Sequence, residues 1–341
     1  MPSKKKPTPK KSPAKATVSR RSSGQAVMTP VPDANRNKNV IRILIFAVVV
    51  VAIVEAMNLF HGGDVVKDYK VQSLIRVVGE EKPCGHFTAW GVAPIGKNDF
   101  VVTDQENSRL LVFDREGNFI RSIGKKGTGP KEFQEPSGLT SDNNGNAYVM
   151  DTWNGAIKGF NEKGDLVLTV DLTKFKNFYG PRGVGFDGKN FIVPDTGNHR
   201  VALISLDGNL VVSWGQSGKG PGEYKGPLAA ASDGKGTYYV ADTDNNRLQI
   251  LDQDGKVIKI IKYEAAVTAV AVDKEGRVYV ANNSDNGCVK VYTTKGNYLG
   301  DLRDEKGSGD PFRGVRWMSI SADDTLMLTV GTTASLFKLP A

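Results

Sequence analysis

The stretch YVADTDNNRLQILD, residues 239–252, consists of two short apolar runs on either side of a polar segment that extends from Asp242 to Arg247. Short alternating runs separated by Asp and Asn predict two β-strands joined by a tight connection. The same arrangement recurs at FVVTDQENSRLLVFD (100–114), AYVMDTWNGAIKGFN (147–161) and FIVPDTGNHRVALIS (191–205), and in weaker form at VYVANNSDNGCVKVY (278–292). The chain is therefore built from a repeated unit.

Six copies of this unit can be aligned on the residue that ends the first apolar run. These positions lie 40 to 49 residues apart: Asp104, Asp151, Asp195, Asp242, Asn282 and, in a faint last copy, Gly331. An apolar run precedes the motif, and a Gly-containing turn with another run follows it, so four strands are expected per unit. Repeats of this length made of strands predict the blades of a β-propeller rather than a helical solenoid. The predicted fold class is all-β, with six blades.

The pattern V-x-D-T-x-N-x-R followed by a hydrophobic residue resembles the NHL repeat, whose family folds as a six-bladed β-propeller. The resemblance covers about residues 71–339 and is closest at residues 195–200 and 242–247. In the second copy Ala156 stands where the repeat has Arg, and the last two copies depart further. The resemblance implies the six-bladed fold, whereas the departures argue against a uniform ring of functional residues.

The two ends of the propeller region are complementary. Residues 71–78 align with the predicted fourth strand of the first blade, residues 119–123, whereas the last blade ends after a third strand at residues 335–339. We therefore expect the N-terminal strand to complete the last blade and close the ring, which leaves few strand edges exposed. The predicted propeller domain is residues 71–341, preceded by a linker at residues 61–70.

The first 39 residues are basic and poor in large apolar side chains. They contain ten Lys and Arg residues against a single acidic one, Asp33, with Pro, Ser and Thr between them. Such a segment buries too little apolar surface to offset the entropy of folding, so a disordered tail is expected. Its charge is suited to contact with anionic lipid and to the cytoplasmic side of a membrane.

Residues 40–60, VIRILIFAVVVVAIVEAMNLF, form the long apolar run of the sequence. As a helix, 21 residues suffice to cross the hydrocarbon core of a bilayer, about 30 Å. Glu55 interrupts the run and leaves a shorter core like that of a cleaved signal peptide, which is the alternative. We expect an uncleaved transmembrane signal anchor, with the propeller outside the cytoplasm in the cell envelope.

The charge of the chain is unevenly distributed. The formal net charge is +8, but residues 61–341 hold 34 basic and 35 acidic residues once the 11 basic and 2 acidic residues of residues 1–60 are set aside. A nearly neutral domain is a poor match for the phosphate backbone. The sequence therefore predicts no nucleic acid partner for the propeller.

The acidic residues of the motif are predicted to be structural. An Asp at a strand end followed by Thr and Asn favours Asx-type turns, and the Arg that begins the next run can pair with it. The predicted structural set is Asp104, Arg109, Asp151, Asp195, Arg200, Asp242 and Arg247. Calcium, which takes six or more oxygen ligands, is the alternative use of these carboxylates.

The inventory of catalytic groups is small. Histidine occurs only at His61, His86 and His199, and zinc sites take three or four protein ligands. No Ser-His-Asp or Cys-His arrangement is recognisable. The sequence thus predicts no catalytic residue, no metal site and no cofactor. Related propellers that act as lyases or lactonases hold a metal in the channel, so a metal-dependent lyase or hydrolase is the alternative function.

We expect instead a noncatalytic binding or scaffold module whose partner is a protein, a peptide or a glycan. The connections between the second and third strands are the expected recognition surface, because loops on a rigid scaffold commonly carry binding residues. The candidate binding residues are Trp153, Asn154, Asn198, His199, Asp244 and Asn245.

Overall fold

The computed structural model describes residues 68–78, 84–175, 178–284 and 289–340. The predicted tail (1–39) and transmembrane segment (40–60) lie outside these ranges. Within the described ranges, no helix has the length and apolar character needed to span a membrane. The fold described below belongs to the compact unit Gly63–Ala341.

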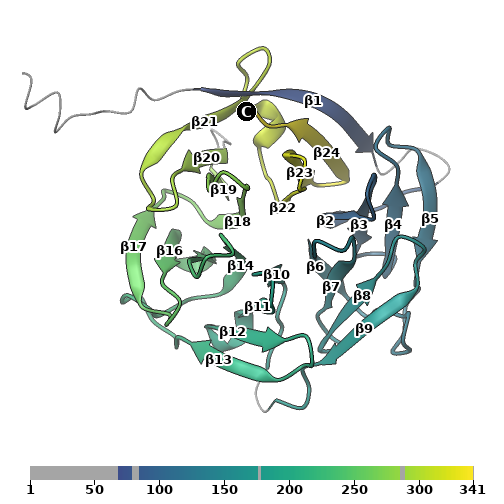
Figure 1. Cartoon of the computed structure of the whole chain (residues 1–341), viewed down its shortest axis with the longest axis horizontal. Coiled ribbons are helices and arrows are strands. Elements are labelled where there is room, and N and C mark those ends of the chain that lie inside the picture. The colour runs from purple at the N-terminus through teal and green to yellow at the C-terminus, as the bar shows by residue number, and fades with distance from the viewer. Residues whose placement is uncertain (1–67, 79–83, 176–177, 285–288, 341) are drawn as a thin grey trace, which may run out of the picture. The chain divides into compact units, whose positions relative to one another are not determined.

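Six four-stranded antiparallel blades form a ring (Figure 1). Blade 1 consists of β2 (Ala89–Ile95), β3 (Asp99–Asp104), β4 (Arg109–Phe113) and β5 (Phe119–Ile123). Blade 2 consists of β6 (Pro136–Ser141), β7 (Ala147–Asp151), β8 (Ala156–Phe160) and β9 (Leu166–Asp171). Blade 3 consists of β10 (Gly185–Phe186), β11 (Asn190–Asp195), β12 (Arg200–Ser205) and β13 (Leu210–Trp214). The first strand of each blade faces the channel and the fourth lies at the rim. The prediction of an all-β six-bladed propeller is confirmed.

Blades 4 to 6 follow the same order. Blade 4 consists of β14 (Pro227–Ser232), β15 (Tyr238–Asp242), β16 (Arg247–Leu251) and β17 (Val257–Lys262). Blade 5 consists of β18 (Val267–Val272), β19 (Val278–Asn282), β20 (Val289–Tyr292) and β21 (Tyr298–Asp304). Blade 6 consists of β22 (Trp317–Ile320), β23 (Thr325–Val330), β24 (Thr333–Lys338) and β1 (Tyr69–Val78). Short 3-10 turns occur at η1 (Thr196–Asn198), η2 (Thr243–Asn245) and η3 (Asp310–Phe312).

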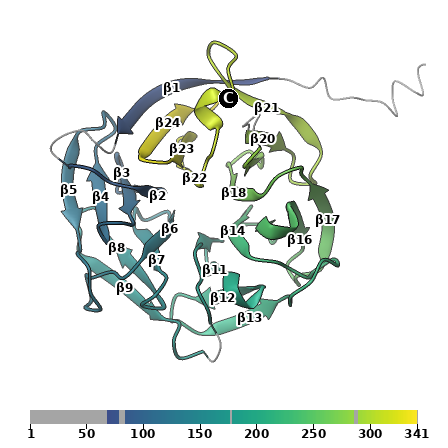
Figure 2. The same cartoon turned by 180° about the vertical axis from the view of Figure 1, so that it is seen from behind.

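Blade 6 is completed by β1, as the sequence predicted. Its antiparallel pairing with β24 extends from Gln72 opposite Lys338 to Val78 opposite Thr333. β1 begins at Tyr69, two residues before the predicted start, and its first three residues pair in parallel with the end of β21. Both views of the ring show β1 spanning the rim from blade 5 to blade 6 (Figures 1 and 2). The strand therefore joins two blades as well as closing the ring.

The core lies between the blades. Middle strands such as β7 and β8 are buried along their whole length, whereas outer strands such as β9 mostly alternate between partly buried and exposed residues. Three of the connectors between blades end in a fully buried aromatic residue: Phe133, Tyr224 and Phe312. These side chains pack against the sheets as wedges and hold neighbouring blades together.

The ring has two different faces. We call the face that carries the β-strand 2–3 connections and the long connectors between blades the loop face, and the opposite one, with the 1–2 and 3–4 turns, the turn face. On the loop face the second strand ends opposite the start of the third, as in the pair Asp242 and Arg247. In blade 6 the corresponding pair is Val330 and Thr333, so Val330 rather than Gly331 occupies the motif position.

Candidate binding surface on the loop face

The motif of blade 4 forms a buried hydrogen-bonded cluster. One carboxylate oxygen of Asp242 accepts from Arg247 Nε at 2.6 Å, and the other accepts from the Lys225 backbone N–H at 2.7 Å. The Arg247 guanidinium also donates to three carbonyls of the connector that enters the blade, at Lys219, Gly220 and Glu223. The cluster thus locks the connector to the hairpin between β15 and β16. Both partners are buried, so neither charge remains without a hydrogen-bonded counterpart.

Blades 1 and 3 have more open versions of the same cluster. Arg109 donates to Asp104 at 2.7 Å and Arg200 donates to Asp195 at 2.8 Å, and in both pairs the carboxylate is inaccessible while about a quarter of the arginine side chain is exposed. In each blade the Asp also accepts a backbone N–H from the segment before the first strand, at Thr88 and Tyr179 respectively.

Blade 2 builds the cluster from a different position. The residue opposite Asp151 is Ala156, but Lys158, two residues further along β8, donates to the Asp151 carboxylate at 3.0 Å. The ammonium group also bonds the carbonyls of Gly129 and Glu132 in the connector. The sequence pattern did not indicate Lys158, because the repeat has its cation at the position of Ala156. Side chains two residues apart on a strand share one face, so either position can reach the same carboxylate.

The three predicted binding asparagines are engaged within the motif. Asn154, Asn198 and Asn245 each donate their side-chain amide to the Asp of their own blade. Asn154 and Asn245 also donate to a carbonyl of the adjoining connector, at Gly127 and Gly218. The structure therefore places these residues in the support of the loops.

His199 and Asp244 lie in neighbouring blades. His199 has a positive φ of 56°, and its Nδ1 accepts a hydrogen bond from the Gly226 backbone N–H at 3.1 Å. This bond ties the β11–β12 connection to the connector that enters blade 4. Asp244 is exposed beside it on η2. His199 and Asp244 thus both lie near the connector that enters blade 4. Both are distant in sequence from Trp153.

Trp153 forms an exposed aromatic pair with a residue that the sequence did not indicate. Its side chain is 50% exposed and lies edge to face with Tyr179, which is 62% exposed, with 6.3 Å between the ring centroids. Trp153 belongs to the β7–β8 connection and Tyr179 to the long segment between β9 and β10. The pair therefore bridges blades 2 and 3.

Glu135 connects this pair to the channel. One of its carboxylate oxygens accepts from the Trp153 indole N–H, and the other accepts from Arg182 at 2.8 Å and from Gln105 at 3.2 Å. The four residues come from blades 1, 2 and 3. A single carboxylate thus fixes the orientation of Trp153 and holds an arginine at the inner edge of the loop face.

At the mouth of the channel, two arginines lie over one indole. The guanidinium carbons of Arg182 and Arg316 are 5.6 Å and 5.8 Å from the centre of the Trp90 ring, a cation–π arrangement. The Trp90 indole nitrogen is buried and has no hydrogen-bond partner in the described part of the chain. Within the same ranges the Arg316 side chain has neither an ion pair nor a hydrogen bond, so its donors are available to a ligand.

Trp317 closes the channel below this mouth. Its indole N–H donates to the Leu139 carbonyl of blade 2 at 2.8 Å, across the ring from blade 6. The ring lies against Gly138 and Gly183, where an added Cβ would come within 2.6 Å and 3.2 Å of it. Gly138 is therefore needed for the close approach of this side chain, whereas a Cβ at Gly183 would first meet the Leu228 carbonyl oxygen, at 2.2 Å.

No described set of three or more His, Cys, Asp or Glu residues is arranged to hold a metal ion. Of the histidines within the described ranges, His199 accepts the backbone bond given above and His86 is an exposed residue 3.8 Å from Glu106. His61 lies outside these ranges. The motif carboxylates are directed at Arg, Lys, Asn and backbone donors.

The connectors show two electrostatic effects. A hydrogen bond from the Gly220 N–H, at 2.8 Å, is the main cause that holds the pKa of Glu223 below its usual range, and the Gly129 N–H has the same effect on Glu132. Burial raises the pKa of Tyr224, whose hydroxyl has no hydrogen-bond partner among the described residues. The connectors are thus tied down at both ends, by a carboxylate and by a buried ring.

The fold and this surface define a six-bladed β-propeller with a polar and aromatic loop face. A family model described as "6-bladed beta-propeller" matches residues 95–179. NHL repeat-containing protein 3 from Homo sapiens is 26% identical over 185 residues, which cover 49% of this chain and 52% of that protein. The mouse protein is 28% identical over 162 residues, covering 43% and 46%. The chain thus folds as a six-bladed β-propeller and is similar to NHL repeat-containing proteins over about half of their length.

Two further similarities concern other proteins with related repeats or folds. Peptidyl-glycine alpha-amidating monooxygenase B from Xenopus laevis is 28% identical over 211 residues, covering 56% of this chain and 22% of that protein. The chain thus spans about a fifth of that relative and about half of the NHL repeat-containing proteins. A streptogramin B lyase structure superposes with a TM-score of 0.54 at 12% identity, covering 80% of this chain and 98% of that one. At this identity the likeness concerns the fold alone.

Proposed function

We propose that this protein is a noncatalytic, membrane-tethered propeller that binds a segment of a partner protein on its loop face. In this proposal residues 40–60 anchor the chain and the propeller lies outside the cytoplasm. The names of the NHL repeat-containing relatives support the class of module. The choice of a protein segment rests on the residues of the loop face.

The observation that carries the proposal is the exposed pair of Trp153 and Tyr179. Among the described residues, the other exposed large hydrophobic side chains are aliphatic: Ile120, Val167, Leu206, Leu210, Val211 and Ile258. Trp, Tyr and Arg are the residue types most enriched among energetically dominant interface residues. Because Glu135 already fixes the Trp153 indole, binding would cost little side-chain entropy there.

The neighbouring charges indicate what the partner segment carries. Arg182 is neutralised by Glu135, whereas Arg316 offers a guanidinium whose described contact is with the Trp90 ring. A carboxylate is the natural counterpart of such a group, since the planar fork can donate two parallel hydrogen bonds. We infer an acidic side chain, or a C-terminal carboxylate, next to a hydrophobic residue that packs on Trp153 and Tyr179.

Site-specific photocrosslinking in the full-length protein tests this proposal. A benzophenone amino acid at Tyr179 should capture a defined partner, whereas the same amino acid at Val211, which is 55% exposed on the rim, should not. Trp153→Ala and Arg316→Gln should each weaken binding of that partner about tenfold or more, the loss expected for a dominant contact. Equal crosslinking from both positions would contradict the proposal.

Metal analysis of the purified full chain separates this function from the alternative, a metal-dependent lyase or hydrolase. Retention of zinc or calcium at one ion per chain after dialysis against chelator-free buffer would favour the enzyme. We expect substoichiometric metal.

The tether also sets which face meets the partner. The pairing of β1 with blade 6 begins where Gln72 meets Lys338, which lies opposite Thr325 at the turn face. We propose that the anchor lies on that side and that the loop face points away from the bilayer. Single cysteines at Asn144 on the turn face and Asn245 on the loop face, labelled and probed with lipid-depth quenchers, test this. Stronger quenching at Asn245 would reverse the orientation.

A further inference from the structure

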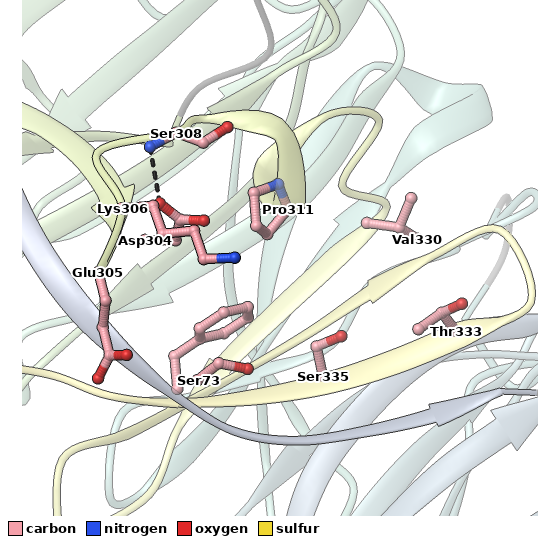
Figure 3. A pocket seen from close by; sticks show the side chains of 10 residues that line it. Ser73, Asp304, Glu305, Lys306, Ser308, Pro311, Val330, Thr333 and Ser335 are labelled. Carbon is pink, nitrogen blue, oxygen red and sulfur yellow. Dashed lines mark hydrogen bonds between the residues drawn. The ribbon is translucent and has the colours of Figure 1, made fainter.

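Blade 6 contains a cavity of about 720 Å³ beneath the connector that leads from β21 to β22 (Figure 3). This volume is within the range of about 300–1,000 Å³ typical of ligand sites. The walls come from three parts of the chain: the connector, the hairpin of β23 and β24, and the edge of β1. They comprise Ser73, Asp304, Glu305, Lys306, Ser308, Pro311, Val330, Thr333, Ser335 and Phe337.

The cavity lies at the position that the motif cluster fills in other blades. By strand register, Val330 and Thr333 of blade 6 correspond to Asp242 and Arg247 of blade 4. Ser335, two residues after Thr333, corresponds to Gln249. All three blade 6 residues line the cavity. Thr333 and Ser335 are smaller than Arg247 and Gln249, so the space that the arginine and the glutamine fill in blade 4 is left open.

The connector side of the cavity matches as well. In blade 4 the guanidinium of Arg247 bonds the carbonyls of Gly220 and Glu223, which are four residues and one residue before the buried Tyr224. Counted back from Phe312, these positions are Ser308 and Pro311, and both line the cavity. In blade 2 the ammonium of Lys158 occupies the same place. The connector residues that correspond in sequence to those receiving a cation in two other blades therefore border the open space of blade 6, where the Ser308 carbonyl accepts the Asp304 backbone N–H at 2.8 Å.

The chain supplies no such cation from β24. The basic residue of this strand, Lys338, lies at its turn-face end and donates to the Asp323 carbonyl. On the connector wall, Asp304 accepts the Ser308 N–H at 2.7 Å and keeps a carboxylate beside the cavity (Figure 3). With Glu305 and Lys306 the formal charge of the lining is −1. Lys306 extends toward the cavity from the exposed connector and carries the same charge as the missing cation.

We propose that the blade 6 cavity binds an arginine side chain presented by a partner protein, which takes the place that Arg247 has in blade 4. Its guanidinium donates to the connector and to Asp304, and its aliphatic part packs on Phe337 and Val330. This site is separate from the Trp153 and Tyr179 pair, and it does not depend on the function proposed for that pair.

Calorimetric titration of the full-length protein with acetyl-Gly-Arg-Gly-amide tests the site, with the citrulline peptide as the matched neutral control. We expect the arginine peptide to bind about tenfold more tightly than the citrulline peptide, because a hydrogen bond to a charged group usually contributes about this much to the affinity. Asp304→Asn should weaken arginine binding by a similar factor. Lys306→Gln should strengthen it severalfold, because a like charge is removed.

A double variant, Val330→Asp with Ser335→Lys, introduces into blade 6 the acid and the cation of blade 2 and should abolish peptide binding. Ser335→Leu, which places an uncharged apolar side chain in the space of the missing cation, should do the same and serves if the double variant does not fold. Trp153→Ala should leave the titration unchanged. Equal binding of the citrulline peptide, loss of binding in Lys306→Gln, or full binding by Ser335→Leu would each overturn the proposal.

Discussion

Blades 4 and 6 both consist of four antiparallel strands and both have a buried aromatic residue at the end of the connector, yet they differ where the second strand meets the third. Blade 4 holds Asp242, Arg247 and Gln249 in one hydrogen-bonded cluster. Blade 6 has Val330, Thr333 and Ser335 at these positions and an open cavity instead. Strand pairing and the aromatic wedge therefore suffice for a blade. The cluster is a separate lock between connector and hairpin, and where it is absent a binding space can exist.

Blade 2 shows that the lock depends on geometry. Lys158 reaches Asp151 from the position that Gln249 has in blade 4 and bonds the equivalent connector carbonyls. The requirement is a cationic donor at either of two positions on one strand face. Blade 6 meets it at neither position.

The largest effect should come from the feature that only blade 6 has, its completion by a distant strand. Deletion of β1 (Tyr69–Val78) exposes the edge of β24 and removes the link to β21. We expect a fall in melting temperature of more than about 10 °C, or aggregation through the open edge. A ten-residue deletion within residues 1–39 is the control and should melt like the parent. An unchanged melting curve for the β1 deletion would show that the ring closes without it.

Removal of the lock in blade 4 should have the next largest effect. Arg247→Ala leaves the Asp242 carboxylate buried without its charged partner, a change that costs about 3–5 kcal/mol in comparable sites. Arg200→Ala in blade 3 should cost about 1–2 kcal/mol, because that arginine is partly exposed and its loss admits water. Urea denaturation of both variants measures the difference. Equal losses would mean that burial does not determine the strength of the lock.

The same substitution at equivalent positions of blades 4 and 6 should have opposite signs. Gln249→Leu removes the acceptor of the Gly222 N–H and a donor to Asp242, for a loss of about 1–3 kcal/mol. Ser335→Leu fills the cavity and should gain up to about 1 kcal/mol. Thermal melts of the two variants test the pair of predictions. A destabilised Ser335→Leu variant would show that the cavity cannot admit an apolar side chain.

The smallest effect concerns the carboxylate of the connector that enters blade 4, Glu223. Glu223 in blade 4 has a lowered pKa because it accepts the Gly220 N–H, whereas blade 6 has Pro311 at this position. A lowered folded pKa contributes stability above the ordinary value of about 4.3, and this contribution disappears as the pH falls through the folded pKa. Between pH 5 and pH 3 the free energy of unfolding of Glu223→Gln should therefore fall less than that of the parent. The difference should correspond to the titration of about one group and is measured from the urea midpoints. Parallel pH profiles would exclude the contribution.

The sequence by itself determined the repeated unit, the number of blades and the strand that closes the ring. These features follow from local rules, because a strand, a tight turn and the next strand are adjacent in the chain and their apolar pattern fixes the register. The pairs of Asp with Arg at five residues' distance could be foreseen for the same reason. Lys158 could not, because it departs from the repeated pattern although it reaches the same carboxylate.

Tertiary structure decided the surfaces on which function is proposed. Trp153 was visible in the sequence as an aromatic residue in a connection, but its partners Tyr179 and Glu135 come from other segments. Trp90 and Arg316 meet only because the first and last blades are neighbours in the closed ring. The blade 6 cavity likewise depends on residues near both ends of the propeller. Contacts between residues far apart in the chain leave no periodic pattern, since they arise from ring closure rather than from strand alternation.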